Sequence, residues 1–413
     1  MDFGSILVYV TSYFGLFTAS FFILTLFENK HKLSSPEPTF FPTVTICVPA
    51  YNEEKTLAKT VESLLNMNYP KDKLKIYVVN DGSKDRTLEI AKQFEKYGVK
   101  VIDKKNSGKA DSLNTIIKMC DTEFFGALDA DSFADENSIR RMIGFFADPS
   151  VMAVTPSMMV YNPKGILQKV QHIEFLFGIF LRKVFSYLGS IHVTPGPLSI
   201  FRKSFFDKHG GYVLNNLTED IEVALRIQSL GYNIENSLDA YVYTVAFNKF
   251  KPLFNQRKRW YTGFLQNVHK YKSLFSLKHG NLGLIVLPSS FVSIVLVIIS
   301  LGYVFYNLII KGIVKNYLNL KAINFEFWTL FNNIKFDFFY FNITSLFFIS
   351  IASLFISISL IYIAKRLAKR EKGIALSYVY FALTYWFLYG IWWIASGFAI
   401  LTNKKQKWGD QEI

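Results

Sequence analysis

Cysteine is scarce in this chain, which has only Cys47 and Cys120 among its 413 residues. Two thiols supply neither a disulfide framework nor the ligand set of a structural zinc site. A cysteine-rich secreted module and a zinc-finger protein are therefore excluded, and we expect both thiols to be reduced.

Charged residues are missing from four long apolar stretches. Each stretch exceeds the roughly 20 residues that a helix needs to cross a bilayer, which favours membrane spans over the alternative of buried core helices. The first stretch also lacks the basic region and small-residue cleavage site of a signal peptide, so we expect a retained anchor. The stretches cover residues 6–27, 282–310, 338–363 and 374–401.

Basic residues beside these stretches predict their orientation. Lys30 and Lys32 follow the first stretch, and the loop 365–370 before the fourth carries four more cations. Because cations favour the cytoplasmic side, the segment between the first two spans is expected in the cytoplasm. Four crossings would place the lysine-rich tail 404–407 outside, against this rule. The alternative is that one C-terminal stretch is re-entrant or interfacial.

The net charge of +14 is strongly basic, but no zinc knuckle, helix-turn-helix or RNA-binding signature accompanies it. We therefore expect no nucleic-acid partner. In a membrane protein, such a charge favours binding to anionic lipid headgroups and to diphosphate ligands.

Short β-branched runs alternate with helical periodicity between the first two apolar stretches. This alternation predicts βαβ units with a mainly parallel sheet, whose ligands bind at the carboxyl ends of the strands. The predicted strands are 44–48, 75–79, 99–102 and 124–128, and the helices between them are 55–67, 86–97 and 109–119.

Two later segments, 167–187 and 250–275, are amphipathic and mix aromatic with basic residues. Such helices lie in membrane interfaces, although ordinary surface helices of a soluble domain are the alternative. The predicted organisation is an N-terminal anchor (1–30), a cytoplasmic catalytic domain (40–248), interface helices (249–280) and a C-terminal membrane region of about three spans (281–413).

Carboxylates follow the predicted strands. Asp81 ends the second strand, and Asp129 and Asp131 end the fourth. Two alternate carboxylates at a strand end can share one hard divalent ion, Mg²⁺ or Mn²⁺, with a diphosphate. Asp-x-Asp also occurs in many loops, so this pattern alone is weak.

Two further motifs have both a structural and a chemical interpretation. Thr218-Glu219-Asp220 opens a predicted helix, where it would serve as a cap or supply a general base. Gln256, Arg259 and Trp260 lie on the second amphipathic segment. Arg binds phosphate oxygens and Trp stacks under sugars, but an interface helix also needs basic and aromatic residues.

The order of these motifs resembles the processive family 2 glycosyltransferases, which include the cellulose, hyaluronan, chitin and poly-β-1,6-N-acetylglucosamine synthases. The resemblance spans about residues 44–263. It is specific because several motifs occur in order: Ala50-Tyr51-Asn52-Glu53, Asp81-Gly82-Ser83, Gly108-Lys109-Ala110, Asp129-Ala130-Asp131, Thr194-Pro195-Gly196, Thr218-Glu219-Asp220 and Gln256-x-x-Arg259-Trp260.

This resemblance implies a nucleotide-sugar-binding α/β domain of the GT-A fold, joined to an α-helical transmembrane region. It also implies a role for each matching position. On the donor side, the nucleobase would be contacted by Ala50, Tyr51 and Glu53, uracil or ribose by Asp81, the phosphates by Lys109 and the nucleotide by Asp129. Asp131 would hold the metal, and Asp220, with Glu219 beside it, would be the general base. The diphosphate and the acceptor sugar would be held by Gln256, Arg259 and Trp260.

The implied activity is a membrane-bound inverting glycosyltransferase that moves sugar from UDP-N-acetylglucosamine or UDP-glucose to a growing polysaccharide, with coupled export as a further expectation. The expected location is the cell membrane, with membrane lipids as partners. Because only about three C-terminal spans follow, a pore for a long polymer would need self-association or an accessory membrane subunit.

Two segments depart from the family pattern. Pro156-Ser157-Met158 replaces a Gly-Asn-containing stretch, and the acceptor-side strand at 194–199 is rich in proline. These departures concern the sugar and the product length. The alternatives are transfer of a single sugar to a lipid acceptor and a catalytically inactive membrane scaffold, against which the intact Asp131, Asp220 and Arg259-Trp260 argue.

Overall fold

The computed structural model describes every residue except 1, 323–344, 370–372, 403–406, 409–410 and 413. An eight-stranded mixed sheet forms its centre, in the order β3-β2-β1-β4-β7-β6-β8-β5. β1, β2, β3 and β4 run parallel to one another, β6 is parallel to β8, and β7 and β5 are antiparallel to their neighbours. The strands are β1 (Val44–Ala50), β2 (Leu74–Asp81), β3 (Lys100–Lys104), β4 (Phe124–Ala127), β5 (Ser132–Ala134), β6 (Val151–Val160), β7 (Ser199–Arg202) and β8 (Asn233–Thr244).

The prediction of a mainly parallel α/β sheet is therefore confirmed for the first four strands. The expected strand at 194–199 is wrong: residues 194–198 form a loop, and β7 begins at Ser199. Pro195 and Pro197 have no backbone N–H to donate to a ladder, and Leu198 has a positive φ of 58°, so this loop cannot pair as a strand.

Helices cover both faces of the sheet, and longer helices follow. Those packed on or beside the sheet are α2 (Leu57–Leu65), α3 (Thr87–Lys92), α4 (Lys109–Met119), α5 (Ser138–Ile143), α7 (Lys203–His209) and α8 (Glu219–Ser229). The longer ones are α1 (Phe3–Glu28), α6 (Ile166–Tyr187), α9 (Phe250–Lys270), α10 (Leu287–Phe305), α12 (Ser345–Ala368) and α13 (Ala375–Leu401). The short helix α11 (Gly312–Ala322) comes after α10, and β9 (Lys407–Trp408) pairs with β10 (Gln411–Glu412).

The sheet is buried on both faces because alternate side chains of each strand point to opposite sides. On β1, Ile46 and Val48 pack into one apolar cluster with Leu57 of α2. Cys47 packs into the other cluster with Leu113 of α4. Cys47 and Cys120 are free and buried.

Four helices in the described part of the chain are long and apolar enough to cross a membrane, as expected from the sequence. They are 3–28, 282–315, 345–368 and 375–401. The third was expected to begin at residue 338, but residues 338–344 lie outside the described part. Thr25, Leu26 and Phe22 of α1 are buried, so the inner end of this helix packs against the rest of the protein.

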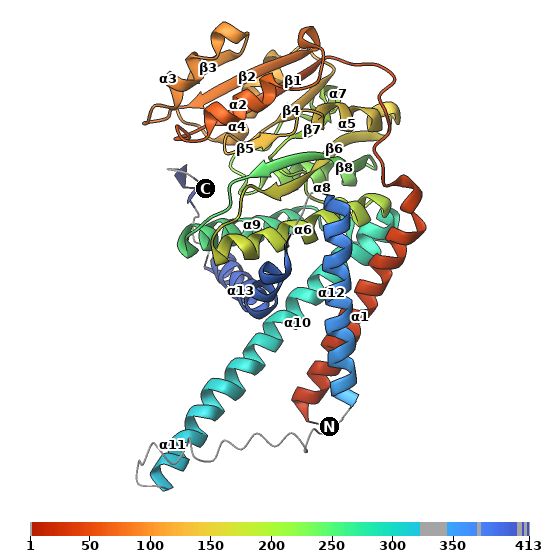
Figure 1. Cartoon of the computed structure of the whole chain (residues 1–413), viewed down its shortest axis with the longest axis vertical. Helices are drawn as coiled ribbons and strands as arrows, with labels where there is room; N and C mark the ends of the chain where they lie inside the picture. Colours follow the sequence, from red (N-terminus) through yellow and green to blue (C-terminus); the bar gives the residue numbers. More distant parts are fainter. Residues whose placement is uncertain (1, 323–344, 370–372, 403–406, 409–410, 413) are drawn as a thin grey trace.

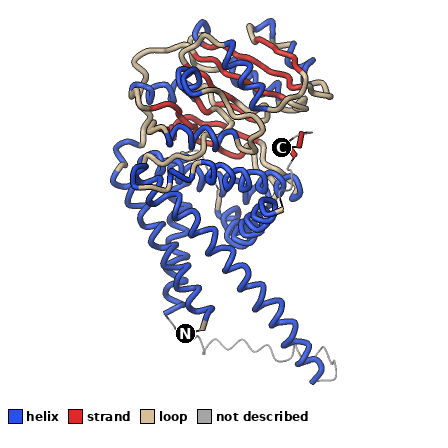
Figure 2. Tube along the Cα trace, turned by 180° about the vertical axis from the view of Figure 1, so that it is seen from behind, coloured by secondary structure: helices blue, strands red, loops and turns tan. Residues whose placement is uncertain are grey.

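The helices form two groups that differ in direction. α6 and α9 lie across the molecule beneath the sheet, whereas α1, α10 and α12 extend away from it (Figure 1; Figure 2). α13 is seen nearly end-on in Figure 1 and does not follow the extending helices. Hydrogen bonds join α13 to α6 and α9. Tyr385 Oη donates to Glu174 of α6 at 3.2 Å, and Ser396 Oγ donates to the Lys258 carbonyl of α9 at 3.1 Å.

Candidate active site

A cavity of about 800 Å³ opens between the carboxyl ends of the strands and the helices α6 and α9. All twelve residues that the sequence predicted as site residues line it. The structure therefore brings together positions that are as much as 210 residues apart in the chain. They are Ala50, Tyr51, Glu53, Asp81, Lys109, Asp129, Asp131, Glu219, Asp220, Gln256, Arg259 and Trp260.

The end of β1 supplies one wall of the cavity through Ala50, Tyr51 and Glu53. Asn52 adopts a positive φ of 56°, which turns the chain out of the strand, and its N–H donates to Ser83 Oγ at 3.0 Å. Glu53 Oε2 accepts a hydrogen bond of 2.7 Å from Thr56. Burial raises the pKa of Glu53 to about 7 despite this hydrogen bond, so the carboxyl group is poorly stabilised as an anion.

Asp81 orients the loop that precedes α4. Its Oδ1 accepts from the Ser107 N–H at 2.9 Å and from Lys104 Nζ at 2.7 Å, and its Oδ2 accepts from the Gly108 N–H at 2.8 Å. Both carboxylate oxygens are thus used within the protein. Any contact of Asp81 with a nucleotide would be made in addition to this positioning of the loop.

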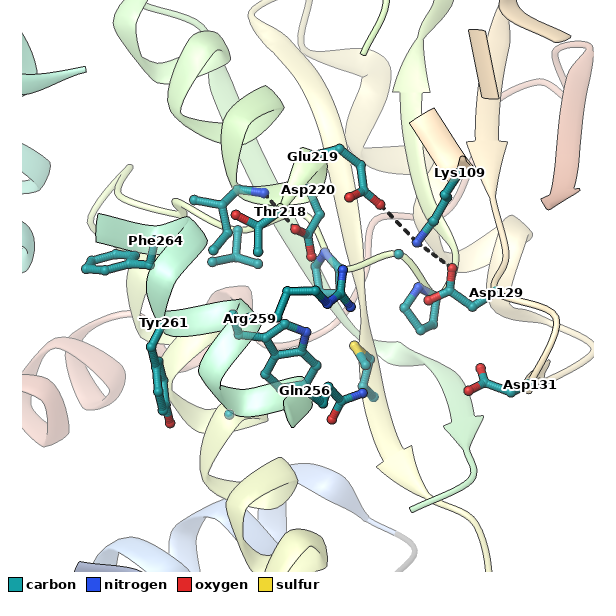
Figure 3. Close-up of a pocket in the computed structure, with 18 of the residues that line it drawn as sticks. Lys109, Asp129, Asp131, Thr218, Glu219, Asp220, Gln256, Arg259, Tyr261 and Phe264 are labelled. Atoms are coloured by element: carbon teal, nitrogen blue, oxygen red, sulfur yellow. Dashed lines mark hydrogen bonds and ion pairs between the residues drawn. The ribbon is translucent and has the colours of Figure 1, made fainter. Parts of the chain in front are cut away.

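Lys109 begins α4 and bridges two carboxylates. Its Nζ lies 2.6 Å from Asp129 Oδ1 and 3.2 Å from Glu219 Oε1, and Figure 3 shows both ion pairs. Gly196 makes this arrangement possible, because a Cβ at this position would lie 2.5 Å from Lys109 Nζ and 2.6 Å from Asp129 Oδ2. Burial opposes the charge of Lys109, but Asp129 and Glu219 raise its pKa, so it remains a cation.

Asp131 points into the cavity apart from Lys109 (Figure 3). Asp131 Oδ1 accepts a hydrogen bond of 3.0 Å from Ser132 Oγ. Burial and the neighbouring charge of Asp129 raise the pKa of Asp131 to about 6. An adjacent divalent cation would stabilise the ionised form of Asp131. The described residues contain no cluster of three or more metal-ligating side chains. Asp131 and Asp129 would supply carboxylate oxygens to an Mg²⁺ or Mn²⁺ ion, and its remaining ligands would have to come from a diphosphate and water.

Glu219 and Asp220 open α8 in different electrostatic environments. Burial opposes ionisation of Glu219, but Lys109 and Arg259 lower its pKa. Burial and the charge of Glu219 raise the pKa of Asp220 to about 7. Thr194 fixes the main chain here, because its N–H and Oγ1 both donate to the Asp220 carbonyl, at 3.2 and 2.9 Å.

Thr218 occupies the cap position of α8 but makes no side-chain cap hydrogen bond. Its Oγ1 accepts instead from Asn267 Nδ2 of α9 at 3.0 Å. The Thr218-Glu219-Asp220 motif thus ties α8 to α9 as well as presenting its carboxyl groups to the cavity.

α9 places the Gln-x-x-Arg-Trp residues opposite α8. Arg259 donates to the Leu217 carbonyl at 3.1 Å, one turn before the Glu219-Asp220 pair. The Arg257 guanidinium lies 4.1 Å from the centre of the Trp260 ring and forms a bidentate ion pair with Glu174 of α6, at 2.8 and 3.1 Å. Gln256 accepts a hydrogen bond from Arg257. These contacts join the α9 wall of the cavity to α6.

The sequence did not predict the part of the cavity wall that comes from α6, α10, α13 and the loop between α6 and β7. These residues carry no motif and come together only through the packing of helices far apart in sequence. Amphipathicity alone drew attention to α6, without identifying which side chains face inward. The missed residues include Glu174, Phe175, Arg182, His192, Ser290, Ile294, Tyr389 and Trp393.

Comparisons with known proteins agree with this geometry. A poly-beta-1,6-N-acetyl-D-glucosamine synthase of Staphylococcus epidermidis is 32% identical over 248 residues, which cover 59% of this chain and 60% of the relative. The Staphylococcus aureus protein of the same name is 31% identical over 225 residues, covering 53% and 54%. The chain thus spans less than two thirds of the length of these relatives.

Among solved structures, a mannosyltransferase of Pyrobaculum calidifontis in complex with GDP-Man and Mn²⁺ matches 96% of this chain and 99% of its own. The TM-score is 0.58 at 19% identity, which establishes likeness of fold. The expected GT-A-like domain with a helical membrane region is confirmed. Residues 45–210 match Glycosyl transferase family 2, so this segment of the chain is similar to the members of that family.

Proposed function

We propose that this chain is a membrane-bound inverting glycosyltransferase that uses a UDP-sugar, UDP-N-acetylglucosamine or UDP-glucose, as donor. The observation that carries the proposal is the Asp220 carboxyl group. It faces the same cavity as the donor-side residues, and its pKa of about 7 suits a group that must take up a proton near neutral pH.

In this reaction Asp220 removes the proton from an acceptor hydroxyl group as its oxygen attacks the anomeric carbon of the donor sugar. The bond from that carbon to the diphosphate breaks on the opposite face, and UDP leaves with the bonding electrons. A single displacement inverts the configuration and needs no second nucleophile. Glu219, held by Lys109, keeps a negative charge beside Asp220 and so keeps its pKa high.

Lys109 and Arg259 would bind the diphosphate of the donor, Asp129 would contact the nucleotide and Asp131 would hold the metal ion. A divalent cation held by Asp131 would supply positive charge against the leaving diphosphate. The Mn²⁺ in the mannosyltransferase of similar fold supports this assignment. Ala50, Tyr51, Glu53 and Asp81 would surround the nucleoside.

The acceptor has two candidates. The names of the staphylococcal relatives support a growing poly-N-acetylglucosamine chain. Transfer of one sugar to a lipid is the second candidate, and it is favoured by the membrane helices α10 and α13, which contribute Ile294 and Trp393 to the cavity wall. In either case Trp260 would support the acceptor sugar.

We also propose the predicted division into anchor, catalytic domain, interface helices and membrane region, with the catalytic domain in the cytoplasm. In this arrangement α1, α10 and α12 cross the membrane and α13 is the interfacial stretch. Three crossings would place the tail after α13 on the same side as the catalytic domain, as the positive-inside rule requires for its lysines.

The test of the proposed function is Asp220→Asn in the purified full-length protein, assayed with radiolabelled UDP-sugars and Mn²⁺. We expect sugar transfer to fall by about 100- to 10,000-fold, the usual contribution of a general base, while UDP binding is retained. Asp207→Asn, on the surface helix α7, is the matched control and should transfer normally. Transfer by Asp220→Asn at the parent rate would refute the role of Asp220.

A further inference from the structure

Arg182 of α6 lines the cavity, and two nitrogens of its guanidinium group have no hydrogen-bond partner among the described residues. Its Nε and Nη2 atoms are buried, and within the described part of the chain they make no hydrogen bond. Other buried cations nearby are matched: Lys183 Nζ donates to the Asn236 carbonyl at 3.0 Å, and Arg257 pairs with Glu174. Arg182 therefore stands out in this layer.

An unpaired buried cation is costly, because burial removes its hydration without supplying an opposite charge. Burial alone lowers the pKa of Arg182 to about 10, and no acidic group offsets it. Since arginine remains protonated at neutral pH even so, the charge persists. A site that keeps an uncompensated guanidinium group facing a cavity is suited to an anionic ligand, and Arg binds phosphate oxygens in particular.

Arg182 lies on the acceptor side of the site. Phe185, one turn further along α6, has its ring 5.4 Å from the ring of His192, which lies 6.1 Å from Phe264 of α9. The same loop continues to Thr194, which is bonded to the Asp220 carbonyl. The proposed donor phosphate contacts, Lys109 and Asp131, belong instead to the strand-end wall.

The cavity wall becomes apolar from Arg182 toward the membrane. α10 contributes Ser290 and Ile294, one turn apart, and α13 contributes Tyr389 and Trp393, also one turn apart. The two helices approach closely here, since a Cβ at Gly390 would lie 2.8 Å from Leu301. Ile294 belongs to a candidate membrane span, whereas Arg182 lies on the transverse helix α6 beneath the sheet (Figure 1).

The polar and apolar groups that line the cavity thus follow the order of groups in an amphiphilic lipid, from its polar headgroup to its hydrocarbon chain. Asp220 lies where a reactive hydroxyl group would be, Arg182 where a phosphate would be, and Ile294 with Trp393 where a hydrocarbon chain would begin. A neutral glycan would use the aromatic side chains but would leave the Arg182 charge uncompensated.

We propose that the acceptor is a phospholipid in which a phosphate ester joins an apolar chain to a hydroxyl-bearing headgroup, with Arg182 binding the phosphate. This inference rests on the proposed transferase function and favours its second candidate acceptor. In the reaction, the headgroup oxygen bonds to the anomeric carbon, UDP departs, and the hydroxyl proton passes to Asp220. The phosphate ester of the acceptor is unchanged.

The experiment uses the purified full-length protein in dodecyl maltoside with radiolabelled UDP-N-acetylglucosamine or UDP-glucose and Mn²⁺. Three acceptors are compared: dioleoylphosphatidylglycerol, undecaprenyl-diphospho-N-acetylglucosamine and neutral dioleoylglycerol. The first two carry the phosphate on different lipids, so they identify its source. We expect label in the lipid extract with at least one phosphate-bearing acceptor and little with dioleoylglycerol.

Arg182→Gln should raise the KM for that acceptor by about 10- to 100-fold, the range for loss of a charged hydrogen-bond partner. The KM for the donor should stay unchanged, and retained UDP binding shows that the variant is folded. Arg182→Lys, which keeps the charge, should restore part of the affinity. Arg140→Gln on the outer helix α5 removes an exposed arginine and should behave as the parent.

Equal acceptor KM values in the parent and Arg182→Gln would overturn the inference, as would a long polymer made equally well by both proteins without added lipid. If the parent releases no UDP from any donor, the proposed function itself fails. The inference is then tested by binding, in a tryptophan-fluorescence titration of the parent. At least one of the two phosphate-bearing lipids must bind about 10-fold more tightly than dioleoylglycerol, and equal affinities for all three lipids overturn the inference.

Discussion

Glu219 and Asp220 are neighbours in sequence, yet the protein shifts their pKa values in opposite directions. Lys109 lies 3.2 Å from Glu219 and stabilises its anion, whereas burial and the Glu219 charge raise the pKa of Asp220 to about 7. Pairs of titratable groups separated in this way mark acid–base assignments in enzymes. One member holds the charge, and the other is ready to accept a proton.

The raised pKa of Asp220 predicts how activity depends on pH. A general base must be ionised to act, so kcat/KM should fall about tenfold per pH unit below about 7 and level off above it. The measurement is initial transfer rate from pH 5 to 9 at saturating Mn²⁺. A rate that stays constant down to pH 5 would contradict this assignment.

Glu219→Gln should shift the dependence of transfer rate on pH toward lower pH. Removing the negative neighbour lowers the pKa of Asp220, and the freed charge of Lys109 acts in the same direction. We therefore expect the acid limb at a lower pH, together with a reduced maximum rate, since Lys109 loses one partner. Lys203→Gln, a substitution on α7 outside the cavity, should not change the pH at which the transfer rate falls. An acid limb at higher pH in Glu219→Gln would refute the electrostatic coupling.

Asp131 provides a prediction about metal use. Because a cation binds the ionised carboxylate, the apparent affinity for Mn²⁺ should decrease as the pH falls below about 6, where Asp131 gains a proton. Asp131→Asn should lose the metal-dependent activity at every pH, and Asp121→Asn, an exposed aspartate, should keep it. Mn²⁺ titrations of transfer rate test this, and parent activity that is unaffected by a chelator would disprove it.

Trp260 should contribute more to acceptor binding than to donor binding. Its ring lines the cavity beneath the Arg257 guanidinium group. We expect Trp260→Ala to raise the acceptor KM by about fivefold, which corresponds to the loss of about 1 kcal/mol of aromatic contact. Trp260→Phe should lose less. Tyr97→Ala, at an exposed aromatic residue on the far side of the sheet, is the control, and an equal rise in both KM values would argue against an acceptor role.

Gly263 allows α9 to contact α8. A Cβ at this position would lie 2.2 Å from Thr218 Oγ1. Gly263→Ala should therefore cost about 1–3 kcal/mol of stability through overpacking and displace Arg259 and Trp260 from the carboxylates. Gly302→Ala, in α10 where a Cβ would meet no atom within 4 Å, should be tolerated. Thermal unfolding and transfer rate measured on both variants provide the comparison.

The sequence predicted the first half of the sheet well because its strands are continuous apolar runs with polar residues at their ends. α4 begins and ends where the periodicity indicated, at Lys109 and Met119. The second half was harder to predict. β6 and β8 pair only through long-range contacts, and a single strand carries no signal of its partner or direction.

The donor side of the site was predictable for the same reason, since Asp81, Asp129 and Asp131 follow strands. The acceptor side was not. Arg182 sits among the other cations of an amphipathic helix, and nothing in its neighbouring sequence distinguishes it from Lys183, which is bonded to the Asn236 carbonyl. Only the position of α6 between β8 and the cavity separates the two side chains, since Lys183 bonds to β8 and Arg182 lines the cavity.

The contact between Tyr385 and Glu174 joins residues 211 positions apart. As a ribosome makes this chain, the catalytic sheet is complete before α13 exists. The wall formed by Tyr389 and Trp393 is therefore added last, after the preceding helices have entered the bilayer. Until α13 docks, the cavity lacks the wall formed by Tyr389 and Trp393. Under the proposed function, sugar transfer would therefore begin only after this last helix has docked.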